Sequence, residues 1–362
     1  MEEIHQLVHT LTFGDAISGE VFALQDVLRA AGSNSEIFAL NIDPRYKSAA
    51  RDISHFPTEF KGTVILHYSL GSPLNQRYTD LNCAHRILVY HNLTPAKWFA
   101  GINPRITRDI EQGLKELPEL CKISDLLISD SKYNASELGA LGFHSEVLPL
   151  PVDPKRWGLE PNSGILNLLK ADSRKHLLHV GRVAPNKCIE DLIKITYFLH
   201  KYLELPCKLW LVGHDIDTEL YSFSLKRLVR ELDLMEVVEF TGRMADQEIK
   251  ALYLSASIYL CMSEHEGFCC PVVEAMEFGL PVVAYASSAL PDTVGGAGVL
   301  VHNKEHIQVA ELVKRVCLDS SLRSELIAAG KQRVAELSYE NFAKLARELL
   351  LKPAASKAAM GQ

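Results

Sequence analysis

One stretch decides the fold prediction: Ser263-Glu264-His265-Glu266-Gly267-Phe268-Cys269-Cys270-Pro271-Val272-Val273-Glu274-Ala275-Met276. It follows an apolar, strand-like run over residues 257–262 and enters a helix predicted to begin at Pro271, since proline suits the first helical position. Gly279 ends that helix, and residues 281–285 read as the next buried strand. Glu266 is therefore expected on a strand-to-helix loop and Glu274 about one turn into the helix. Both lie at the carboxyl edge of a parallel sheet, where open α/β sheets bind ligands.

Carboxylates at such an edge suit neutral hydroxyl donors such as sugars and ribose, and a helix N-terminus makes negative charge tolerable there. Taken alone, each acid is most often an ordinary solvated residue. Taken together, the two acids form a pattern: seven residues separate Glu266 from Glu274, Gly-Phe follows the first and Ala-Met follows the second. This pattern resembles the E-x7-E motif of retaining GT-B glycosyltransferases, family 4 (glycosyltransferase group 1). The resemblance implies an α/β fold of the GT-B type, with two Rossmann-like doubly wound domains facing a central cleft.

Composition agrees with a two-domain globular protein. The chain has 362 residues, 47% of them hydrophobic, and a net charge of −7 from 38 basic and 45 acidic residues, which argues against a nucleic-acid partner. No run approaches the roughly 18 apolar residues of a membrane span, and the acidic N-terminus is unlike a signal peptide, so a cytoplasmic location is expected. Eight scattered cysteines lack metal-ligand spacing. Cys269 and Cys270 beside His265 are interpreted as reduced thiols, and no metal site is predicted.

Strand and helix patterns alternate twice along the chain, which predicts two doubly wound parallel sheets. A proline-rich stretch over residues 149–164 separates them and reads as a linker. The predicted domains are residues 1–155 on the acceptor side and 156–337 on the donor side. In the GT-B fold that this chain resembles, the last helix crosses back to the N-terminal domain, which implies that role for residues 338–362. The first helix is expected from about Glu20 to Ala31, capped by Ser18 or Gly19.

A basic loop, Gly181-Arg182-Val183-Ala184-Pro185-Asn186-Lys187, lies between a predicted strand and a predicted helix. Arg182 can fork onto two phosphate oxygens, Lys187 adds a mobile charge, and the helix N-terminus also favours an anion. The loop resembles the family's G-R-x-x-x-x-K segment, whose Arg and Lys bind the donor diphosphate. Asn186 and Cys188 depart from the family's usual Glu and Gly but leave the basic pair intact.

Two further strand ends resemble family segments. Val212-Gly213-His214 is similar to the V-G-x strand end, and Phe240-Thr241-Gly242-Arg243-Met244 is similar to the F-x-G segment that meets the nucleobase. A nicotinamide dehydrogenase is the generic rival, but no G-x-G-x-x-G follows a strand with an acid about 20 residues on.

On the N-terminal side, His91 ends a buried strand and resembles the family's active-site histidine, which faces the donor sugar. Gly14 and Asp15 match the position of the family's flexible loop near the diphosphate, without its paired glycines. Asp15 either meets an acceptor hydroxyl or caps the following helix, and the sequence favours neither. Lys97-Trp98-Phe99 is a basic and aromatic patch that either touches a lipid-linked acceptor at a membrane surface or packs in the core.

The resemblance implies a retaining, metal-independent transfer of a sugar from a UDP- or GDP-linked donor to a sugar or lipid-linked acceptor, in polysaccharide or cell-surface glycan assembly. The implied catalytic residues are His91, Arg182, Lys187 and Glu266. The implied donor-binding residues are Gly14, Asp15, Arg182, Lys187, Gly213, Arg243, Met244, Glu266, Gly267, Phe268, Cys269 and Glu274. No cofactor is expected, and the oligomeric state is not predicted. A sugar-nucleotide epimerase and a non-catalytic nucleotide-sugar-binding subunit remain alternatives.

Overall fold

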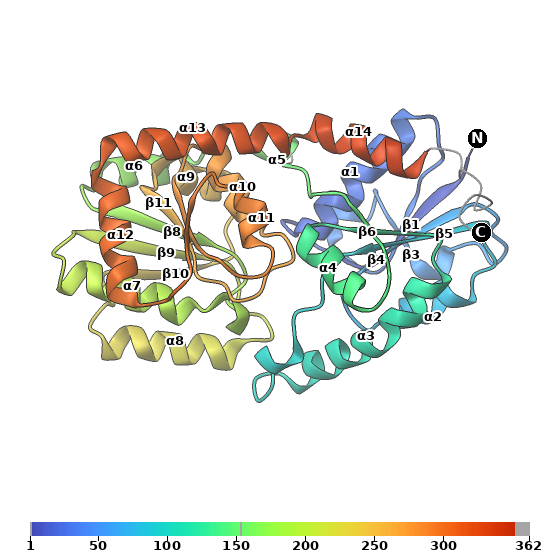
Figure 1. Cartoon of the computed structure of the whole chain (residues 1–362), viewed down its shortest axis with the longest axis horizontal. Coiled ribbons are helices and arrows are strands. Elements are labelled where there is room, and N and C mark those ends of the chain that lie inside the picture. The colour runs from blue at the N-terminus through green and yellow to red at the C-terminus, as the bar shows by residue number, and fades with distance from the viewer. Residues whose placement is uncertain (1, 153, 352–362) are drawn as a thin grey trace. The chain divides into compact units, whose positions relative to one another are not determined.

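The computed structural model describes residues 2–152 and 154–351 (Figure 1). The chain divides into two compact units. The first contains Met1–Leu93, Gln112–Pro151 and Leu337–Gln362, and the second contains Thr94–Glu111 and Val152–Glu336. The predicted tail after residue 351 lies outside the described residues.

Among its described residues, the first unit builds a seven-stranded parallel sheet in the order β3-β2-β1-β4-β5-β6-β7. The strands are β1 (Ile4–Leu11), β2 (Ile37–Ile42), β3 (Arg51–Asp52), β4 (Thr63–Tyr68), β5 (His85–Tyr90), β6 (Leu126–Ser129) and β7 (Glu146–Val147). The helices are α1 (Ala16–Ala30), α2 (Pro73–Asp80), the C-terminal part of α3 (Pro104–Ile123), α4 (Lys132–Ala140) and α14 (Tyr339–Leu350), with short 3-10 turns at Pro44–Tyr46 and Ile53–His55. A 3-10 turn at Ala96–Trp98 and the first part of α3 belong to the second unit. The strand order is doubly wound, as predicted.

Side-chain alternation along the strands gives the first sheet two apolar faces, because successive residues of a strand point to opposite sides. Ile65 and Val89 pack in a cluster with Leu24 of α1 and Phe342 of α14. Their strand neighbours pack in a second cluster with residues of α2, α3 and α4: Val64, Leu66 and Leu88. Helix α14, the last of the described helices, therefore completes the core of the first unit.

The described part of the second unit forms a six-stranded parallel sheet in the order β10-β9-β8-β11-β12-β13. The strands are β8 (Lys175–Val180), β9 (Cys207–Val212), β10 (Val238–Gly242), β11 (Ile258–Cys261), β12 (Val282–Tyr285) and β13 (Val299–Val301). The helices are α5 (Pro154–Trp157), α6 (Ser163–Ala171), α7 (Ile189–Lys201), α8 (Glu219–Glu231), α9 (Asp246–Ser255), α10 (Cys270–Glu277), α11 (Leu290–Val294), α12 (His306–Leu318) and α13 (Ser320–Glu336), with a 3-10 turn at Pro185–Lys187. Figure 1 shows this second sheet with helices on both faces.

Several local predictions differ from the structure. Helix α1 begins at Ala16, one turn before the predicted start, because the Asp15 side chain accepts hydrogen bonds from the backbone N–H and the hydroxyl of Ser18 at 2.9 and 3.0 Å. The predicted caps, Ser18 and Gly19, are therefore wrong and lie inside the helix. Helix α10 begins at Cys270, so Pro271 is its second residue.

Two larger segments also differ. The stretch predicted as a linker runs into helix α6, whose cap is Asn162, accepting from the N–H of Ile165 at 3.0 Å. Residues 94–111, expected with the N-terminal domain, group with the second unit. Within that unit the Asn103 side chain donates to the carbonyl of Asp217 at 3.1 Å, a contact across 114 residues of sequence. Among the residues that the structure describes, none of the helices combines the length and the apolar character that a membrane span requires.

Candidate active site

The loops at the carboxyl edge of the second sheet hold most of the predicted donor-binding residues. The loop after β8 carries Arg182 and Lys187, and the loop after β11 carries Glu266. Asn186 joins the two loops, because its side-chain amide donates to the carbonyl of His265 at 3.0 Å and its carbonyl accepts from the N–H of Glu264 at 2.9 Å. Asn186, a departure from the family pattern, thus has a structural role in holding the basic and acidic loops together.

Lys187 and Glu266 lie in direct contact. The ammonium nitrogen of Lys187 is 2.7 and 2.6 Å from the two carboxylate oxygens of Glu266. Burial acts to raise the pKa of Glu266, but Lys187 outweighs it and lowers that pKa, so the pair is ionised. Buried charges need such pairing. The structure therefore brings together two predicted site residues that are 79 positions apart.

Arg182 has fewer partners. One terminal nitrogen donates to the carbonyl of Ile216 at 2.8 Å, and the guanidinium lies 5.9 Å from the ring centre of Phe99. Its Nε is buried and has no hydrogen-bond partner among the described residues. An unpaired buried donor costs roughly 1–3 kcal/mol, so a ligand that supplies an acceptor here would be stabilised.

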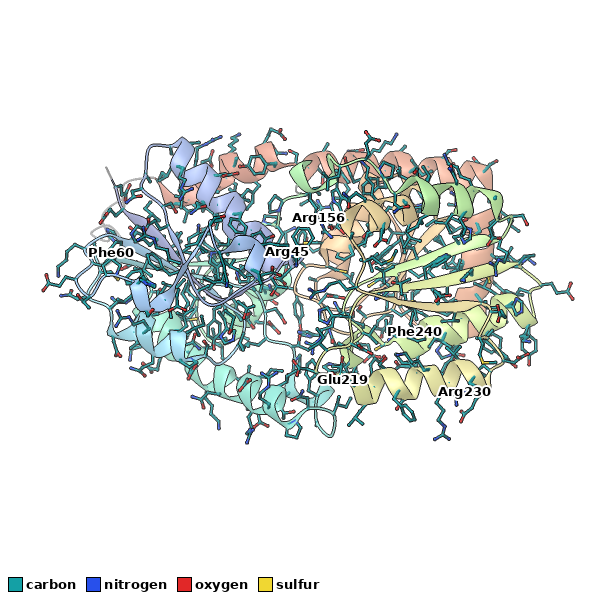
Figure 2. All side chains as sticks on the ribbon, turned by 180° about the vertical axis from the view of Figure 1, so that it is seen from behind. Arg45, Phe60, Arg156, Glu219, Arg230 and Phe240 are labelled. Carbon is teal, nitrogen blue, oxygen red and sulfur yellow. The ribbon has the colours of Figure 1, made fainter. Side chains whose placement is uncertain are left out.

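Glu274 is already held by protein groups. One carboxylate oxygen accepts from Arg156 at 2.6 Å, and the other accepts from the hydroxyl of Tyr253 at 2.9 Å. Arg156 also pairs with Asp246 at 3.0 Å and lies 4.4 Å from the ring centre of Trp157. Figure 2 labels Arg156 on the ribbon of the second unit. No pattern in the sequence indicated Arg156, Tyr253 or Asp246, because the contacts span 118, 21 and 90 residues.

Gly213 allows the close approach of two strand ends. A Cβ added there would lie 1.9 Å from the carbonyl oxygen of Gly181, and its φ of +146° is unfavourable for other residues. On the next strand end, Arg243 is exposed and Met244 packs against an apolar cluster of the second unit. The predicted contacts of these residues with a nucleotide stay predictions.

Gly267, Phe268 and Cys269 connect β11 to α10. Phe268 is buried, and its carbonyl accepts from the hydroxyl of Thr293 at 2.5 Å. Cys269 adopts a left-handed φ of +77° at the N-cap of α10, so the helix begins abruptly after the loop. Cys261, Glu266 and Cys269 have potential metal-ligand atoms within 4.8 Å of one another, but the Glu266 carboxylate is bound by Lys187. The expectation of no metal site stays a prediction.

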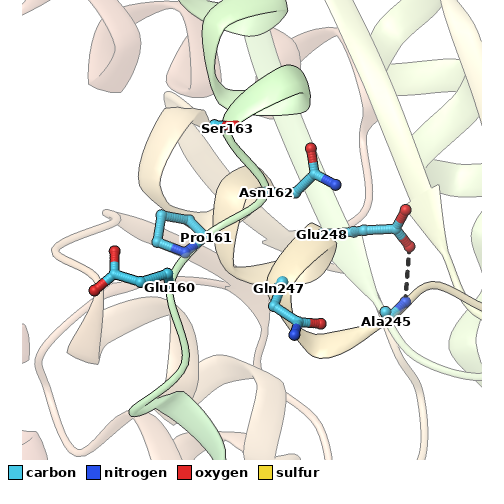
Figure 3. Close-up of a pocket in the computed structure, with 7 residues that line it drawn as sticks. All are labelled: Glu160, Pro161, Asn162, Ser163, Ala245, Gln247 and Glu248. Atoms are coloured by element: carbon cyan, nitrogen blue, oxygen red, sulfur yellow. Dashed lines mark hydrogen bonds between the residues drawn. The ribbon is translucent and has the colours of Figure 1, made fainter.

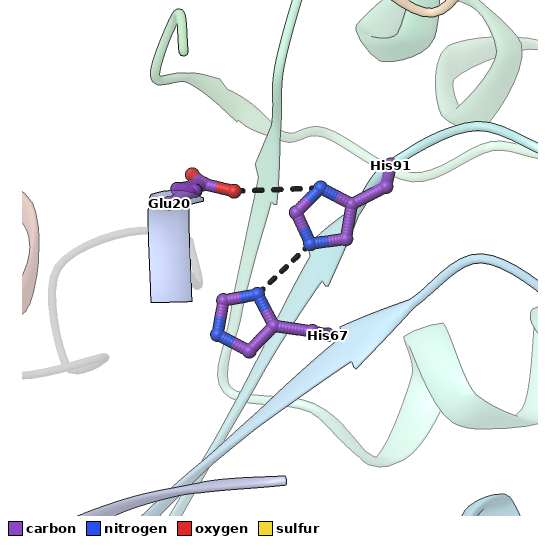
Figure 4. Close-up of side chains that lie close together, drawn as sticks. All are labelled: Glu20, His67 and His91. Atoms are coloured by element: carbon purple, nitrogen blue, oxygen red, sulfur yellow. Dashed lines mark hydrogen bonds and ion pairs between the residues drawn. The ribbon is translucent and has the colours of Figure 1, made fainter. Parts of the chain in front are cut away.

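In the first unit, His91 lies in a buried network (Figure 4). Its Nδ1 is 3.0 Å from Asp130 and 3.4 Å from Glu20, and its Nε2 is 2.9 Å from Nδ1 of His67. The far nitrogen of His67 is 2.9 Å from the amide oxygen of Gln6. The His91 side chain is 1% exposed, and both ring nitrogens are engaged. Sequence reasoning named His91 but missed its partners, which come from β1, β4, α1 and the end of β6.

The charges of this network follow from burial. Burial raises the pKa of Glu20 to about 8, and Asp130 adds to the effect. For His91, burial acts to lower the pKa, but Asp130 and Glu20 outweigh it and raise the pKa to about 9. At neutral pH the network therefore holds a protonated Glu20 and an imidazolium that is paired with Asp130. In the structure, His91 is therefore a buried cation whose hydrogen-bond and ion-pair partners all belong to the first unit.

Gly14 and Asp15 precede α1. Gly14 has a φ of +78°, and the Asp15 carboxylate caps the helix. Of the two roles that the sequence left open, capping is therefore the one that the structure shows.

Two pockets of the structure are lined by other residues. One of about 410 Å³ lies between α6 and α9 (Figure 3) and is lined by Glu160, Pro161, Asn162, Ser163, Ala245, Gln247 and Glu248. Another of about 550 Å³ in the first unit is lined by Leu40, Ile42, Lys47, Ala50, Arg51, Asp52 and His55. Neither contains a residue predicted to bind the donor.

Comparison with known proteins finds a family that matches the segment containing the basic and acidic loops. Residues 167–333, which include the basic loop, the Glu266 loop and Glu274, match the family model of glycosyl transferases group 1. The matched residues all lie within the second unit. Over 168 residues the chain is 27% identical to O-antigen chain mannosyltransferase B of Escherichia coli, covering 46% of this chain and 43% of that protein. The chain thus spans less than half the length of the curated relatives first matched.

Solved structures resemble this chain over nearly its whole length. Sucrose-phosphate synthase from Thermosynechococcus elongatus has a TM-score of 0.75 at 21% identity, covering 97% of this chain and 100% of that one. Anabaena HepE, solved in complex with UDP-glucose, has a TM-score of 0.71 at 17% identity with the same coverage. At these identities the likeness shows the fold, which is GT-B with two Rossmann-like units, as predicted. The finer assignment to family 4 stays a prediction.

Proposed function

We propose that this chain is a retaining glycosyltransferase, which moves a sugar from a UDP- or GDP-linked donor to an acceptor hydroxyl in polysaccharide or cell-surface glycan assembly. One observation carries the proposal: Lys187 contacts Glu266 at the carboxyl edge of the second sheet, and Arg182 lies on the same loop as Lys187, within the residues that match the glycosyltransferase family model. The UDP-glucose complex of HepE and the mannosyl transfer named for the E. coli relative support the donor class and the glycan pathway.

The residues present suit the breaking of a sugar–phosphate bond. As the bond from the sugar C1 to the phosphate oxygen breaks, its electron pair leaves with the nucleoside diphosphate. Arg182 and Lys187 stabilise the charge that develops on that group. The acceptor oxygen attacks C1 from the same face, and its proton passes to a phosphate oxygen, so configuration is retained.

Glu266 has acceptor capacity beyond its contact with Lys187, since a carboxylate offers about four lone-pair sites. It accepts hydrogen bonds from hydroxyls of the donor sugar in this proposal. Lys187 is then shared between Glu266 and the diphosphate, which keeps both buried charges paired. Glu274, held by Arg156 and Tyr253, has only its remaining lone pairs for the ribose hydroxyls.

The proposal extends to metal independence and location. Arg182 and Lys187 supply the positive charge at the diphosphate, so the proposed reaction does not use a metal ion. The reaction is placed in the cytoplasm, where nucleotide-sugars are made, with an acceptor in solution or at the inner face of a membrane.

A binding panel tests the donor assignment. UDP-glucose and GDP-mannose are titrated calorimetrically with and without EDTA, and transfer to water or added sugars is followed by NMR, which reports the configuration of the product. We expect one donor to bind in EDTA and Lys187→Met to weaken it at least tenfold. Arg227→Met, an exposed helix residue of the same unit, is the matched control. Binding of neither donor, or an inverted product, contradicts the proposal.

A further inference from the structure

Three neighbouring strands of the second sheet end in the same pattern, a glycine followed by a basic residue. The pairs are Gly181-Arg182 after β8, Gly213-His214 after β9 and Gly242-Arg243 at the end of β10. These strands are adjacent in the order β10-β9-β8. Because parallel strands present their carboxyl ends at one edge, the three basic residues are neighbours.

Backbone hydrogen bonds fix this arrangement beyond the strands. The N–H of Gly213 donates to the carbonyl of Gly242 at 3.0 Å, and the N–H of Val183 donates to the carbonyl of His214 at 2.9 Å. A Cβ at Gly213 would also meet the Gly181 carbonyl at 1.9 Å. The glycines therefore allow the three strand ends to approach closely. The basic residue that follows each glycine is brought close to the other two in this way.

Two polar atoms of this cluster are buried without a hydrogen-bond partner among the described residues: Nε of Arg182 and Nδ1 of His214. Buried polar atoms without a partner are uncommon in native proteins, and a bound ligand with acceptor and donor groups would complete the bonding of these two. The basic groups Arg182 and Arg243 face His214 from the neighbouring strand ends, and Asp215 and Asp217 face it from its own loop.

The two acids have other partners. Asp217 pairs with Arg105 at 3.0 Å, and Asp215 lies 3.8 Å from Lys226. In the absence of an anion, burial and then the two guanidiniums lower the pKa of His214, so the imidazole is mainly neutral at pH 7. A diphosphate bound between these groups raises the pKa of His214, because its negative charge favours the imidazolium.

We propose that Arg182, His214 and Arg243 form one anion-binding cluster, and that His214 takes up a proton from solvent when it binds the diphosphate of a nucleotide-sugar. This inference rests on the proposed function, and it adds His214 to the residues that bind the donor. Donor affinity then falls as the pH rises, since the bound state holds one more proton than the free state. The loss approaches tenfold per pH unit between the pKa of free His214, below 6.5, and its higher pKa in the complex.

Calorimetric titration between pH 6.0 and 8.5 tests this, with UDP-glucose and GDP-mannose as probes. Both phosphates of a nucleotide-sugar are diesters that stay ionised in this range, so the ligand itself supplies no titration. Two buffers of different ionisation enthalpy at each pH report the protons taken up. We expect uptake approaching one proton in the wild type and a dissociation constant at least fivefold higher at pH 8.0 than at pH 6.5.

Variants separate His214 from general effects. His214→Gln should bind weakly with a flat pH profile, and His214→Arg should bind without pH dependence because its charge is permanent. His302→Gln, an exposed histidine of the same unit, should keep the wild-type profile. Donor binding with no proton uptake, or a His214→Gln profile that keeps the slope, overturns this inference alone. Binding of neither donor at any pH overturns the proposed function and this inference together.

Discussion

Replacing Arg156 by methionine should destabilise the second unit strongly. The guanidinium lies 2.6 Å from Glu274 and 3.0 Å from Asp246, and both acids are largely buried. Removing one partner of a buried ion pair costs about 3–5 kcal/mol, because a charge is left without compensation. The hydroxyl of Tyr253 still donates to Glu274, so the loss should not exceed this range.

Differential scanning calorimetry measures the effect. In a unit of about 200 residues, each kcal/mol shifts the Tm by roughly 2–4 °C, so Arg156→Met should lower the transition by roughly 6–20 °C. Arg227→Met is the control: Arg227 pairs with Glu231 at the same 2.6 Å, but both side chains are mostly exposed. That pair should contribute under about 0.5 kcal/mol. An Arg156→Met transition within about 2 °C of the control would falsify the reasoning.

Four further predictions concern other parts of the chain. Burial raises the pKa of Glu20 to about 8, so wild-type stability should fall by up to about 1.4 kcal/mol per pH unit as the pH rises from about 4.3, the unfolded pKa, to about 8. Glu20→Gln should remove the contribution of Glu20, while the raised pKa of His91 keeps a fall in stability above about pH 6.5 in both proteins. A difference in Tm from wild type that stays constant between about pH 5.5 and 8 contradicts this prediction. Gly213→Ala should cost about 3 kcal/mol or more, since its Cβ clashes with a backbone oxygen at 1.9 Å. Gly19→Ala, whose Cβ meets no other described residue within 4 Å, should instead stabilise helix α1 by about 0.5–1 kcal/mol, and equal urea midpoints for the two variants would count against both. Phe342→Ala should cost the first unit about 3–5 kcal/mol in the same assay, because the side chain is 4% exposed in its core, and an unchanged midpoint argues against that packing.

Local sequence patterns predicted the segment around Glu266 well. The strand before it, the loop that carries it and the helix that carries Glu274 are observed as β11, a loop and α10. Such patterns succeed because apolar periodicity and proline and glycine positions act over a few residues. They failed at α1, where Ser18 and Asp15 are both good caps and the structure uses Asp15.

Partners of charged side chains were not predictable in this way. The sequence indicated Lys187 as a phosphate ligand, but its contact with Glu266 depends on a connection between two loops 79 residues apart. Arg156 lies in a stretch that reads as a linker, and nothing local shows that it holds two acids of the second unit.

His91 illustrates the same division. Its position at the end of a buried strand was legible in the sequence, and so was its likeness to a catalytic histidine. The charge of His91 could not be predicted from the sequence, because it depends on Asp130 and Glu20. These two residues are distant from His91 in sequence but lie within 3.4 Å of it in the fold.

The sequence by itself determined the α/β class, the two doubly wound sheets and the loops that carry the basic and acidic residues. These features follow from hydrophobic periodicity and turn residues, which act locally along the chain. Only the tertiary structure decided which charges are paired, which polar atoms stay without partners, and that Arg182, His214 and Arg243 are neighbours. Pairing and burial depend on distances through space, and in a parallel sheet residues separated by dozens of positions meet at one edge.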